Sequence, residues 1–483
     1  MDRTPPPVPP PGPRELWVDV MALAGGDGSA QHPAKDLSAV LAPNQRVHLK
    51  SGLYRGPFTL PKDVQLIGEG QAVLYVEGAE GAVVSMPEGG ALTRLSVQGG
   101  RTGVVGAKTV ALEQVHFSGH RFAALAMGSG VLSANNVEVE ASVPDSAGFV
   151  LDATPETPAP EENGTEPPGP RRALDGVKAA LSVTLRGADF RGGLKHALDV
   201  RGASLELSDS ELDGVATPIR VRDSVAVLRS VSLKAGRGPA VFAADSKVSV
   251  NGLEVLGHEY AFQARASELA VEGVHAVGSE HASVAAVQCT GSLKKLRLER
   301  PGNFAAIQVL SSKLTIGEVE IRDADAAGIM VRQGEVAIDG VKVHGVRAEA
   351  NAAGTRDTGG DALMLRGCTG TVKRVEIEDA EGVGAWFSAA AAMQVDGLSC
   401  RRCGLGAMLV ELASRIQASR VTVDGAHGPA VSVIDHGQLE LAGLSSHGAE
   451  VPVWAECGNG AIAKVSGVEG QAQPSSPCVL VKK

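Results

Sequence analysis

A short apolar pattern recurs through the second half of the chain at a nearly constant interval. Each copy has the form apolar–any–apolar. The copies begin at Val231, Leu253, Val274, Leu296, Val319, Val341, Val375, Leu398, Val421 and Leu444. All intervals are 21 to 23 residues long, except the 34 residues from Val341 to Val375. A fixed period in the low twenties is typical of solenoid proteins, in which each repeat packs on its neighbours.

Within each repeat, apolar and polar residues alternate over short stretches, as in Leu205–Ser208 and Ile219–Val221. Alternation with a period of two predicts β-strands with one buried face. Apolar residues at helical spacing do not recur, and the Gly and Ser residues between the stretches disfavour helices. The pattern therefore predicts an all-β solenoid with two or three short strands in each turn.

The repeat extends towards the N-terminus and defines the expected domains. Earlier copies are Val64–Gly68, Leu95–Val97, Val115–Phe117 and Val137–Val139. We expect a β-solenoid over residues 61–480 and a cap over residues 14–60. A cap is needed because the first turn would otherwise expose its core and its strand edges.

Local signals define the elements of the predicted cap. Lys35–Leu41 is typical of a short helix, and Arg46–Leu49 is typical of a strand. Gly25–Ser29 and Ser51–Tyr54 have the composition of turns.

Two segments interrupt the expected solenoid. Residues 153–180 include the Pro- and Glu-rich stretch Thr154–Glu162, which predicts a disordered excursion from one turn. Residues 348–360 account for the long interval after Val341 and predict a loop insertion. Long insertions often carry binding residues.

Composition and charge exclude several classes of protein. Apolar residues make up 43% of the chain, which is enough for a large core, whereas aromatic residues make up only 3%. The net charge of −10 argues against a nucleic-acid partner, because nucleic-acid binding favours a basic face. No run of 18 apolar residues is present, so we expect no transmembrane segment.

The first residues predict a tether. Residues 1–13 are Pro-rich and lack the apolar region of a signal peptide. We expect a disordered segment that follows an export signal, with a bacterial lipid anchor upstream of residue 1. The expected location is extracellular, periplasmic or anchored to the outer membrane. The alternative is a cytosolic protein with a Pro-rich tail.

The six cysteines suggest few cross-links between turns. Cys289, Cys368 and Cys457 lie near the same point of their repeats but several turns apart, too far to pair directly. Cys400 and Cys403 form a single CxxC pair, and a zinc site would need two more ligands. A buried free thiol and a local disulfide both remain open for this pair.

At this point the chain resembles a known superfamily. The period, the short strands and the N-terminal helix are similar to the right-handed parallel β-helix of pectin-lyase-like proteins. Gly26–Ser29, Val47–Leu49 and Gly52–Tyr54 are similar to the start of many members. The resemblance implies about 15–17 turns. It is weak for activity, because the superfamily includes lyases, polygalacturonases, epimerases, tailspikes and adhesins.

Charged residues gather around the long interval. Turns stack about 4.8 Å apart, so equal positions in successive turns form columns. Alignment of the repeats, with the loop folded back, brings together Asp323, Asp325, Asp357, Asp361, Asp379, Glu381, Arg401 and Arg402. We therefore expect a patch of carboxylates beside arginines.

This patch has the composition that a calcium-assisted polysaccharide lyase needs. Carboxylate oxygens are preferred Ca²⁺ ligands, and the predicted metal ligands are Asp323, Asp325, Asp357 and Asp361. The predicted catalytic residues are Arg401, Arg402 and Asp379, with an arginine taking the proton α to a uronate carboxylate. The predicted binding residues are Arg356, Asp357, Asp361 and Trp386. If the protein is not a lyase, we expect no cofactor.

A structural interpretation of the same residues is equally concrete. One column of mixed charge runs through Arg322, His344, Glu378, Arg401, Asp424 and His447. Mixed signs let a solvated corner avoid stacking of like charges, and each exposed pair contributes only about 0–1 kcal/mol. Trp386, which aligns with Met330 and Met364, belongs either to the core or to an outer platform.

Two functions follow from these patterns. The first is a non-catalytic, exported scaffold whose face or loops contact a polysaccharide or a protein. The second is a lyase, hydrolase or epimerase acting on a uronate-containing glycan. We favour the scaffold, because catalytic motifs are absent and Trp and Tyr, which stack on sugar rings, are scarce.

Overall fold

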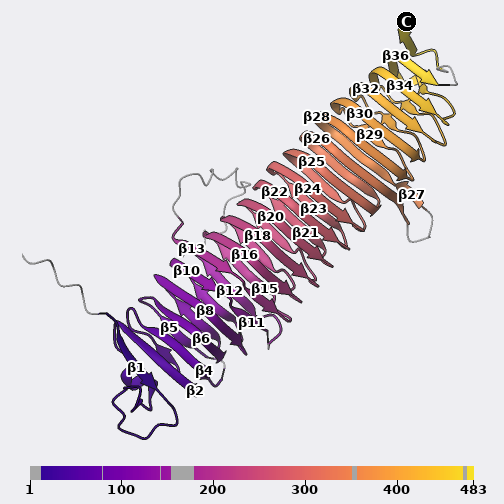
Figure 1. Ribbon diagram of the computed structural model, residues 1–483. Helices are drawn as coiled ribbons and strands as arrows, with labels where there is room; N and C mark the ends of the chain where they lie inside the picture. Colours follow the sequence, from indigo (N-terminus) through magenta and orange to yellow (C-terminus); the bar gives the residue numbers. More distant parts are fainter. Residues whose placement is uncertain are drawn as a thin grey trace, which may run out of the picture. The chain divides into compact units, whose positions relative to one another are not determined.

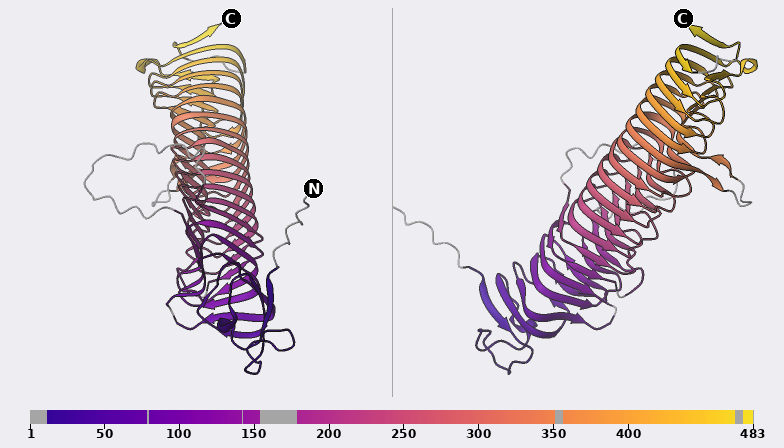
Figure 2. Two further views of the ribbon diagram at one scale, coloured as in Figure 1. Left: turned by 90° about the vertical axis from the view of Figure 1, so that its left-hand side faces the viewer. Right: turned by 45° about the vertical axis from the view of Figure 1, so that its right-hand side comes forward.

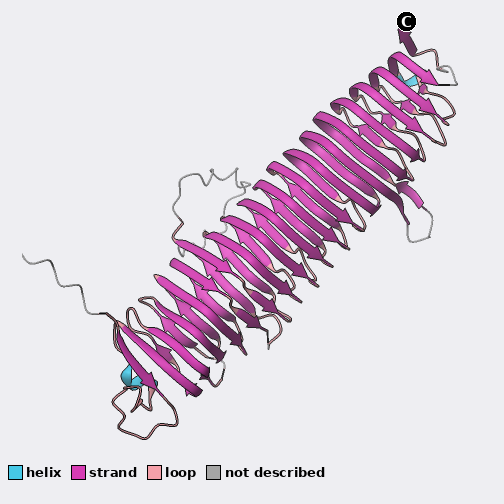
Figure 3. Ribbon diagram, viewed as in Figure 1, coloured by secondary structure: helices cyan, strands magenta, loops and turns pink. Residues whose placement is uncertain are grey.

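The computed structural model describes residues 12–78, 80–141, 143–153, 179–350, 356–470 and 476–482. Strands account for nearly all regular structure in these ranges (Figure 3). Strands of successive turns pair in parallel and form an all-β solenoid of about 18 turns. The predicted parallel β-helix is confirmed, with slightly more turns than expected.

The described residues form two compact units, the first over 12–153 and 179–205 and the second over 206–482. The first unit contains the following elements, several of which are labelled in Figure 1. They are β1 Arg14–Val18, α1 Leu37–Val40, β2 Gln45–Arg55, β3 Phe58–Thr59, β4 Gln65–Val76, β5 Ala82–Met86, β6 Gly90–Gly99, β7 Thr102–Gly106, β8 Thr109–Ser118, β9 Ala123–Met127, β10 Gly130–Asn135, β11 Glu138–Glu140, β12 Ala147–Asp152, β13 Leu181–Arg186, β14 Asp189–Arg191 and β15 His196–Arg201.

The second unit is a regular stack of turns, coloured from magenta to yellow in Figure 2. Its elements, beginning with a strand that starts two residues before the unit, are β16 Ser204–Asp213, β17 Ile219–Arg222, β18 Val225–Lys234, β19 Val241–Ala244, β20 Lys247–Leu256, β21 Tyr260–Arg265, β22 Glu268–Val277, β23 Ala282–Val287, β24 Thr290–Glu299, β25 Ile307–Asp325, β26 Ala327–Ala350, β27 Arg356–Gly359, β28 Asp361–Ala380, β29 Ala385–Ser388, β30 Ala392–Cys403, β31 Met408–Val410, β32 Arg415–Asp424, β33 Val431–Val433, β34 Gln438–His447, β35 Val453–Ala455, the 3-10 helix η1 Cys457–Asn459, β36 Ile462–Gly470 and β37 Val479–Lys482.

The N-terminal cap contains the predicted helix in a shorter form. Helix α1 spans only Leu37–Val40. Asp36 caps its start by accepting a hydrogen bond from the Ser38 backbone N–H, and the backbone is already extended at Leu41. Leu37 is buried. The predicted turn at Ser51–Tyr54 is wrong: these residues continue β2, with an irregular register between Lys50 and Gly52. The Tyr54 side chain turns inward, and its hydroxyl bonds the Val18 carbonyl at 2.9 Å.

In the second unit the ten apolar doublets stack in the predicted register. The first residue of each doublet pairs with the first residue of the next, from Val231 opposite Leu253 to Val421 opposite Leu444. All ten first residues are buried. The 34-residue interval causes no break, because Val341 still pairs with Val375.

Left-handed corners bound every doublet. The residue before the doublet has a positive φ in all ten copies, namely Ser230, Gly252, Gly273, Lys295, Glu318, Gly340, Arg374, Gly397, Arg420 and Gly443. The residue four positions after the first residue of each doublet also has a positive φ in all ten copies. These residues are Ala235, Gly257, Gly278, Arg300, Asp323, Gly345, Asp379, Arg402, Gly425 and Gly448. One left-handed residue bends the chain sharply, and Gly adopts this conformation without steric cost. Each doublet therefore forms one short side of a turn.

A ladder of small polar residues lines another corner of the second unit. The Ser246 hydroxyl accepts from the Ser224 backbone N–H, and the Ser267 hydroxyl accepts from that of Ser246. Cys289 continues the ladder, with its N–H donating to the Ser312 hydroxyl. Cys368, in register with Gly334, lies two turns further on. Both cysteines are free and buried, and they do not pair with each other, as their spacing predicts.

The insertion at residues 348–360 is a hairpin in its described part. Strand β26 runs past the turn as far as Ala350, and β27 pairs with it antiparallel, with Ala348 opposite Gly359. The Glu381 carboxylate accepts a hydrogen bond of 2.9 Å from the Ala348 backbone, which holds the base of the hairpin on the next turn.

Other expectations fall on residues that the structure does not describe. Most of the predicted tether, residues 1–11, and most of the predicted insertion, residues 154–178, lie outside the described residues. Within the described ranges, no helix has the length and apolar character needed to cross a membrane.

Candidate functional site

The predicted column of mixed charge is present. Arg322, His344, Glu378, Arg401, Asp424 and His447 occupy equivalent positions in successive turns. Three predicted site residues of the patch, Asp323, Asp379 and Arg402, lie one position further along and form left-handed corners. Asp tolerates this conformation better than most residues. Backbone geometry alone therefore accounts for the aspartates at two of these corners.

Arginines and carboxylates in the patch neutralise one another. Arg402 Nε lies 2.6 Å from Asp379 Oδ1, and its Nη2 lies 2.9 Å from Asp379 Oδ2. Arg402 also bonds Glu378, and Arg401 Nη2 lies 2.7 Å from Glu378 Oε1. His344 Nδ1 is 3.3 Å from the same carboxylate. The result is an exposed ladder of ion pairs across three turns.

These contacts fix the charge states of the patch. Hydrogen bonds from Arg401 and Arg402 lower the pKa of Glu378 to about 2. The hydrogen bond from Arg402 lowers the pKa of Asp379, and the two carboxylates in turn raise the pKa of Arg402. Arg402 therefore holds its proton firmly. A base that removes a proton from a substrate needs the opposite shift, so the catalytic roles of Arg401, Arg402 and Asp379 stay predictions.

A disulfide fixes the corner that carries the two arginines. Cys400 and Cys403 are bonded, with Cα atoms 6.1 Å apart, and both are buried. This decides between the free thiol and the local disulfide. The bridge spans Arg401 and Arg402 and so holds their backbone beside Glu378 and Asp379.

The predicted metal ligands occupy different environments. Asp361 is buried, accepts a 2.7 Å hydrogen bond from the Val383 backbone, and has a pKa raised by burial. Asp323 and Asp325 are exposed, and Asp325 lies opposite Arg347. The side chains of Arg356 and Asp357 lie outside the described residues. Among the residues that are described, no three His, Cys, Asp or Glu side chains are grouped as metal ligands. The calcium site stays a prediction.

Trp386 lies on the outer face of a strand rather than in the core. It follows Met330 and Met364 in register, as predicted, and alternates with the buried residues Ala385 and Phe387. Its indole packs against a small cluster of Ala305, Ala327, Met330 and Met364. The Arg366 guanidinium lies 5.8 Å from the ring centroid. Trp386 is thus a half-buried outer platform.

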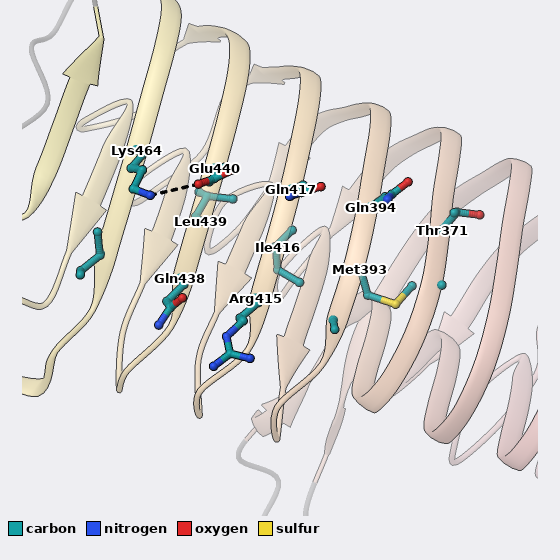
Figure 4. A pocket seen from close by; sticks show the side chains of 13 residues that line it. Thr371, Met393, Gln394, Arg415, Ile416, Gln417, Gln438, Leu439, Glu440 and Lys464 are labelled. Atoms are coloured by element: carbon teal, nitrogen blue, oxygen red, sulfur yellow. Dashed lines mark hydrogen bonds and ion pairs between the residues drawn. The ribbon is translucent and has the colours of Figure 1, made fainter.

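A groove on a different face was not predicted from the sequence. It has a volume of about 670 Å³ and crosses strands β28, β30, β32, β34 and β36 (Figure 4). Its two walls are two columns of mostly polar residues, which alternate along each strand with buried ones. The first wall is Ala392, Arg415, Gln438 and Ile462, and the second is Thr371, Gln394, Gln417, Glu440 and Lys464.

The walls present amide groups at regular intervals. Gln394, Gln417 and Gln438 are exposed, and no hydrogen bond joins their side-chain amides to other described residues. Lys464 Nζ lies 3.1 Å from Glu440 Oε1, so these two charges compensate each other (Figure 4). Adjacent turns are about 4.8 Å apart. The groove therefore offers a repeating series of donors and acceptors.

A glycine extends the hollow towards earlier turns. Gly370 occupies the position between Val336 and Met393, where a Cβ atom would lie 1.8 Å from the Val336 carbonyl oxygen. Gly370 and Thr371 also line a second hollow of about 320 Å³, which reaches Thr290 and Lys313. The spacing of Gln394, Gln417 and Glu440 in the sequence could have indicated this face. The groove was not predicted because the site prediction considered acids, His and Arg at the corners of the turns and did not consider amide side chains within strands.

Comparisons with known proteins add little to this geometry. No protein-family model and no curated protein matches the chain. Among solved structures, the GH136 lacto-N-biosidase of Eubacterium ramulus is 11% identical, with 69% of this chain and 68% of that chain covered and a TM-score of 0.39. The GH87 α-1,3-glucanase of Streptomyces thermodiastaticus is 12% identical, with 96% and 70% covered and a TM-score of 0.21.

The receptor-binding tailspike of bacteriophage Det7 is also similar. It is 11% identical, with 96% of this chain and 75% of that chain covered and a TM-score of 0.22. All three TM-scores are below 0.5, so these similarities carry no argument about function. The assignment of the fold rests on the parallel strand register of the chain itself.

Proposed function

We propose that this protein is a non-catalytic binding protein that holds an extended polysaccharide in the groove of β28, β30, β32, β34 and β36. The observation that carries the proposal is the in-register column of Gln394 and Gln417, faced by Gln438 across the groove. Amides donate and accept hydrogen bonds at once, as sugar hydroxyls do. A ligand with a regular repeat can satisfy one turn after another.

The shape of the groove supports an extended chain rather than a compact ligand. The groove crosses five successive turns, so it is several strand spacings long. One sugar ring is about as long as the spacing between adjacent turns. The exposed side chain of Ile462 adds an apolar surface for the C–H faces of a sugar.

The charges of the groove support binding rather than cleavage. A glycosidase commonly uses two carboxylates that flank the scissile bond. Glu440 is the only carboxylate among the described residues that line this groove, and Lys464 is paired with it. The enzyme alternative, on a uronate-containing glycan, would have to use the patch around Asp379.

We also propose that the protein works outside the cytosol, as an extracellular, periplasmic or outer-membrane-anchored protein. The two disulfides, Cys400–Cys403 and Cys457–Cys478, support this location, because disulfides persist mainly in oxidising compartments. Alkylation of the protein as isolated from its native cells tests the proposal. Labelling of all four cysteines without reduction would contradict it.

The double variant Gln394→Ala/Gln417→Ala tests the groove. Loss of two or more hydrogen bonds should weaken polysaccharide binding by about tenfold in affinity electrophoresis. The matched control is Gln263→Ala/Gln308→Ala, which removes two amides from another face. Equal binding by both double variants, or release of shortened oligosaccharides by the wild type, would contradict the proposal.

A further inference from the structure

One cation in the groove lacks the partner that its equivalents have. Arg415 belongs to a column that passes through Lys247 and continues turn by turn to Ile462. Lys247 pairs with Glu268 in the next turn at 2.9 Å, and Lys313 pairs with Glu335 at 2.8 Å. In this column, a cation is thus normally followed by a carboxylate.

Arg415 breaks that rule. Its neighbours in the column are Ala392 on one side and Gln438 on the other, and neither carries a charge. No ion pair or hydrogen bond joins its guanidinium to another described residue, and its side chain is exposed in the groove (Figure 4). The nearby carboxylate of Glu440 is engaged by Lys464. Arg415 therefore has its full set of donors available to a ligand.

We propose that Arg415 binds an oxyanion substituent, a carboxylate or a sulfate, on the polysaccharide that occupies the groove. This inference rests on the proposed function and names the class of ligand. A guanidinium presents two parallel N–H donors that match the two oxygens of such a group. The amide of Gln438 in the adjacent turn can donate to the same oxyanion or to a neighbouring hydroxyl.

The arrangement sets how many charges the groove can recognise. Arg415 is the one cation without an ion pair among the described residues that line it, whereas the remaining polar positions suit hydroxyl groups. One negative charge on the bound segment is enough to pair with Arg415. A densely charged polymer should therefore bind with nearly the same affinity as a sparsely charged one. Added salt should weaken binding only modestly, because only one ion pair joins the protein to the polysaccharide and salt screens that pair alone.

Binding of three polysaccharides of similar length tests the inference: a neutral galactan, a polygalacturonate and a sulfated galactan. At least one anionic polymer should bind the wild type about tenfold more tightly than the neutral one. Arg415→Ala should abolish this preference, so that the neutral and the anionic polymers bind this variant with similar affinities. Arg415→Lys should restore it only in part, because an ammonium group lacks the fork. Lys247→Ala, in the same column outside the groove, is the matched control and should change nothing.

The outcomes separate the two proposals. Preference for the polygalacturonate identifies a carboxylate, and preference for the sulfated galactan identifies a sulfate. Equal affinity for neutral and anionic polymers, or an anionic preference that survives Arg415→Ala, overturns this inference and leaves the binding groove intact. Failure of the wild type to bind any of the three polymers overturns both.

Discussion

At the scale of single residues, a charged residue that forms a corner of the backbone can be mistaken for a catalytic residue. Asp379 and Arg402 turn left-handed corners, and their side chains pair with each other across adjacent turns. The same two features, an acid and an arginine on consecutive turns, led to the prediction of a lyase site. Corner geometry and charge compensation account for both residues without a substrate.

Substitution of Arg402 tests this interpretation. Arg402→Ala removes the partner of Asp379 and should raise the pKa of Asp379, because the hydrogen bond from Arg402 lowers it. The pKa of Glu378 should rise less, because Arg401, which is the largest cause of its lowering, stays in place. Titration by NMR measures both shifts. Polysaccharide binding should be unchanged. Loss of a polysaccharide-cleaving activity in this variant would instead support the catalytic prediction.

A buried histidine predicts a pH dependence of the first unit. His120 is buried, its Nδ1 bonds the Gly99 carbonyl oxygen, and burial lowers its pKa to about 4. The unfolded chain binds a proton near pH 6.5, whereas the folded chain does so only near pH 4. The contribution of His120 to the free energy of unfolding is therefore fully present above pH 6.5. It is lost as the pH falls from 6.5 towards 4, and the loss amounts to about 3 kcal/mol.

Urea unfolding at pH 7 and pH 4.5 measures this loss. His120→Gln should flatten the difference, because its side chain does not titrate. His116→Gln is the matched control, since His116 is partly exposed and pairs with Glu138 on the surface. An equal loss of stability in all three proteins would exclude His120 as the source.

At the scale of elements, the two disulfides differ in exposure and should differ in reactivity. Cys400 and Cys403 are buried, whereas Cys457 is exposed and Cys478 partly so. The second bridge ties η1 to the segment that precedes β37, and β37 pairs only with β36 among the described strands. Mild reductant should open Cys457–Cys478 first and increase hydrogen exchange in β37. Mass spectrometry after alkylation detects the order, and earlier reduction of Cys400–Cys403 would contradict it.

The same elements show where sequence reasoning succeeds. The apolar doublets predict the stacked short sides of the turns, because an inward position must be apolar in every repeat. Trp386 also lies in its predicted column. The disulfide between Cys457 and Cys478 was not predicted. The two cysteines lie 21 residues apart in the last turns, where the apolar doublet no longer shows which residues of successive turns face each other.

At the scale of the whole molecule, periodicity predicts the parallel solenoid but not the position of the groove. A repeat specifies which residues are inside, since burial is the same in every turn. It does not specify which outer face is hollow, because that depends on side-chain size in several turns at once. Gly370 and the amides of Gln394 and Gln417 shape the groove, yet Gly370 occupies an inward position and the two glutamines are ordinary outer residues of their own repeats.

The central claim is that a polysaccharide occupies the groove. Hydroxyl-radical footprinting, which measures solvent access of side chains, tests it most directly with two residues of similar exposure. Ile462 in the groove is 41% exposed, and Trp454 on another face is 37% exposed. With a bound polysaccharide, we expect oxidation of Ile462 to fall severalfold and oxidation of Trp454 to stay constant. Protection of Trp454 with no change at Ile462 would contradict the account.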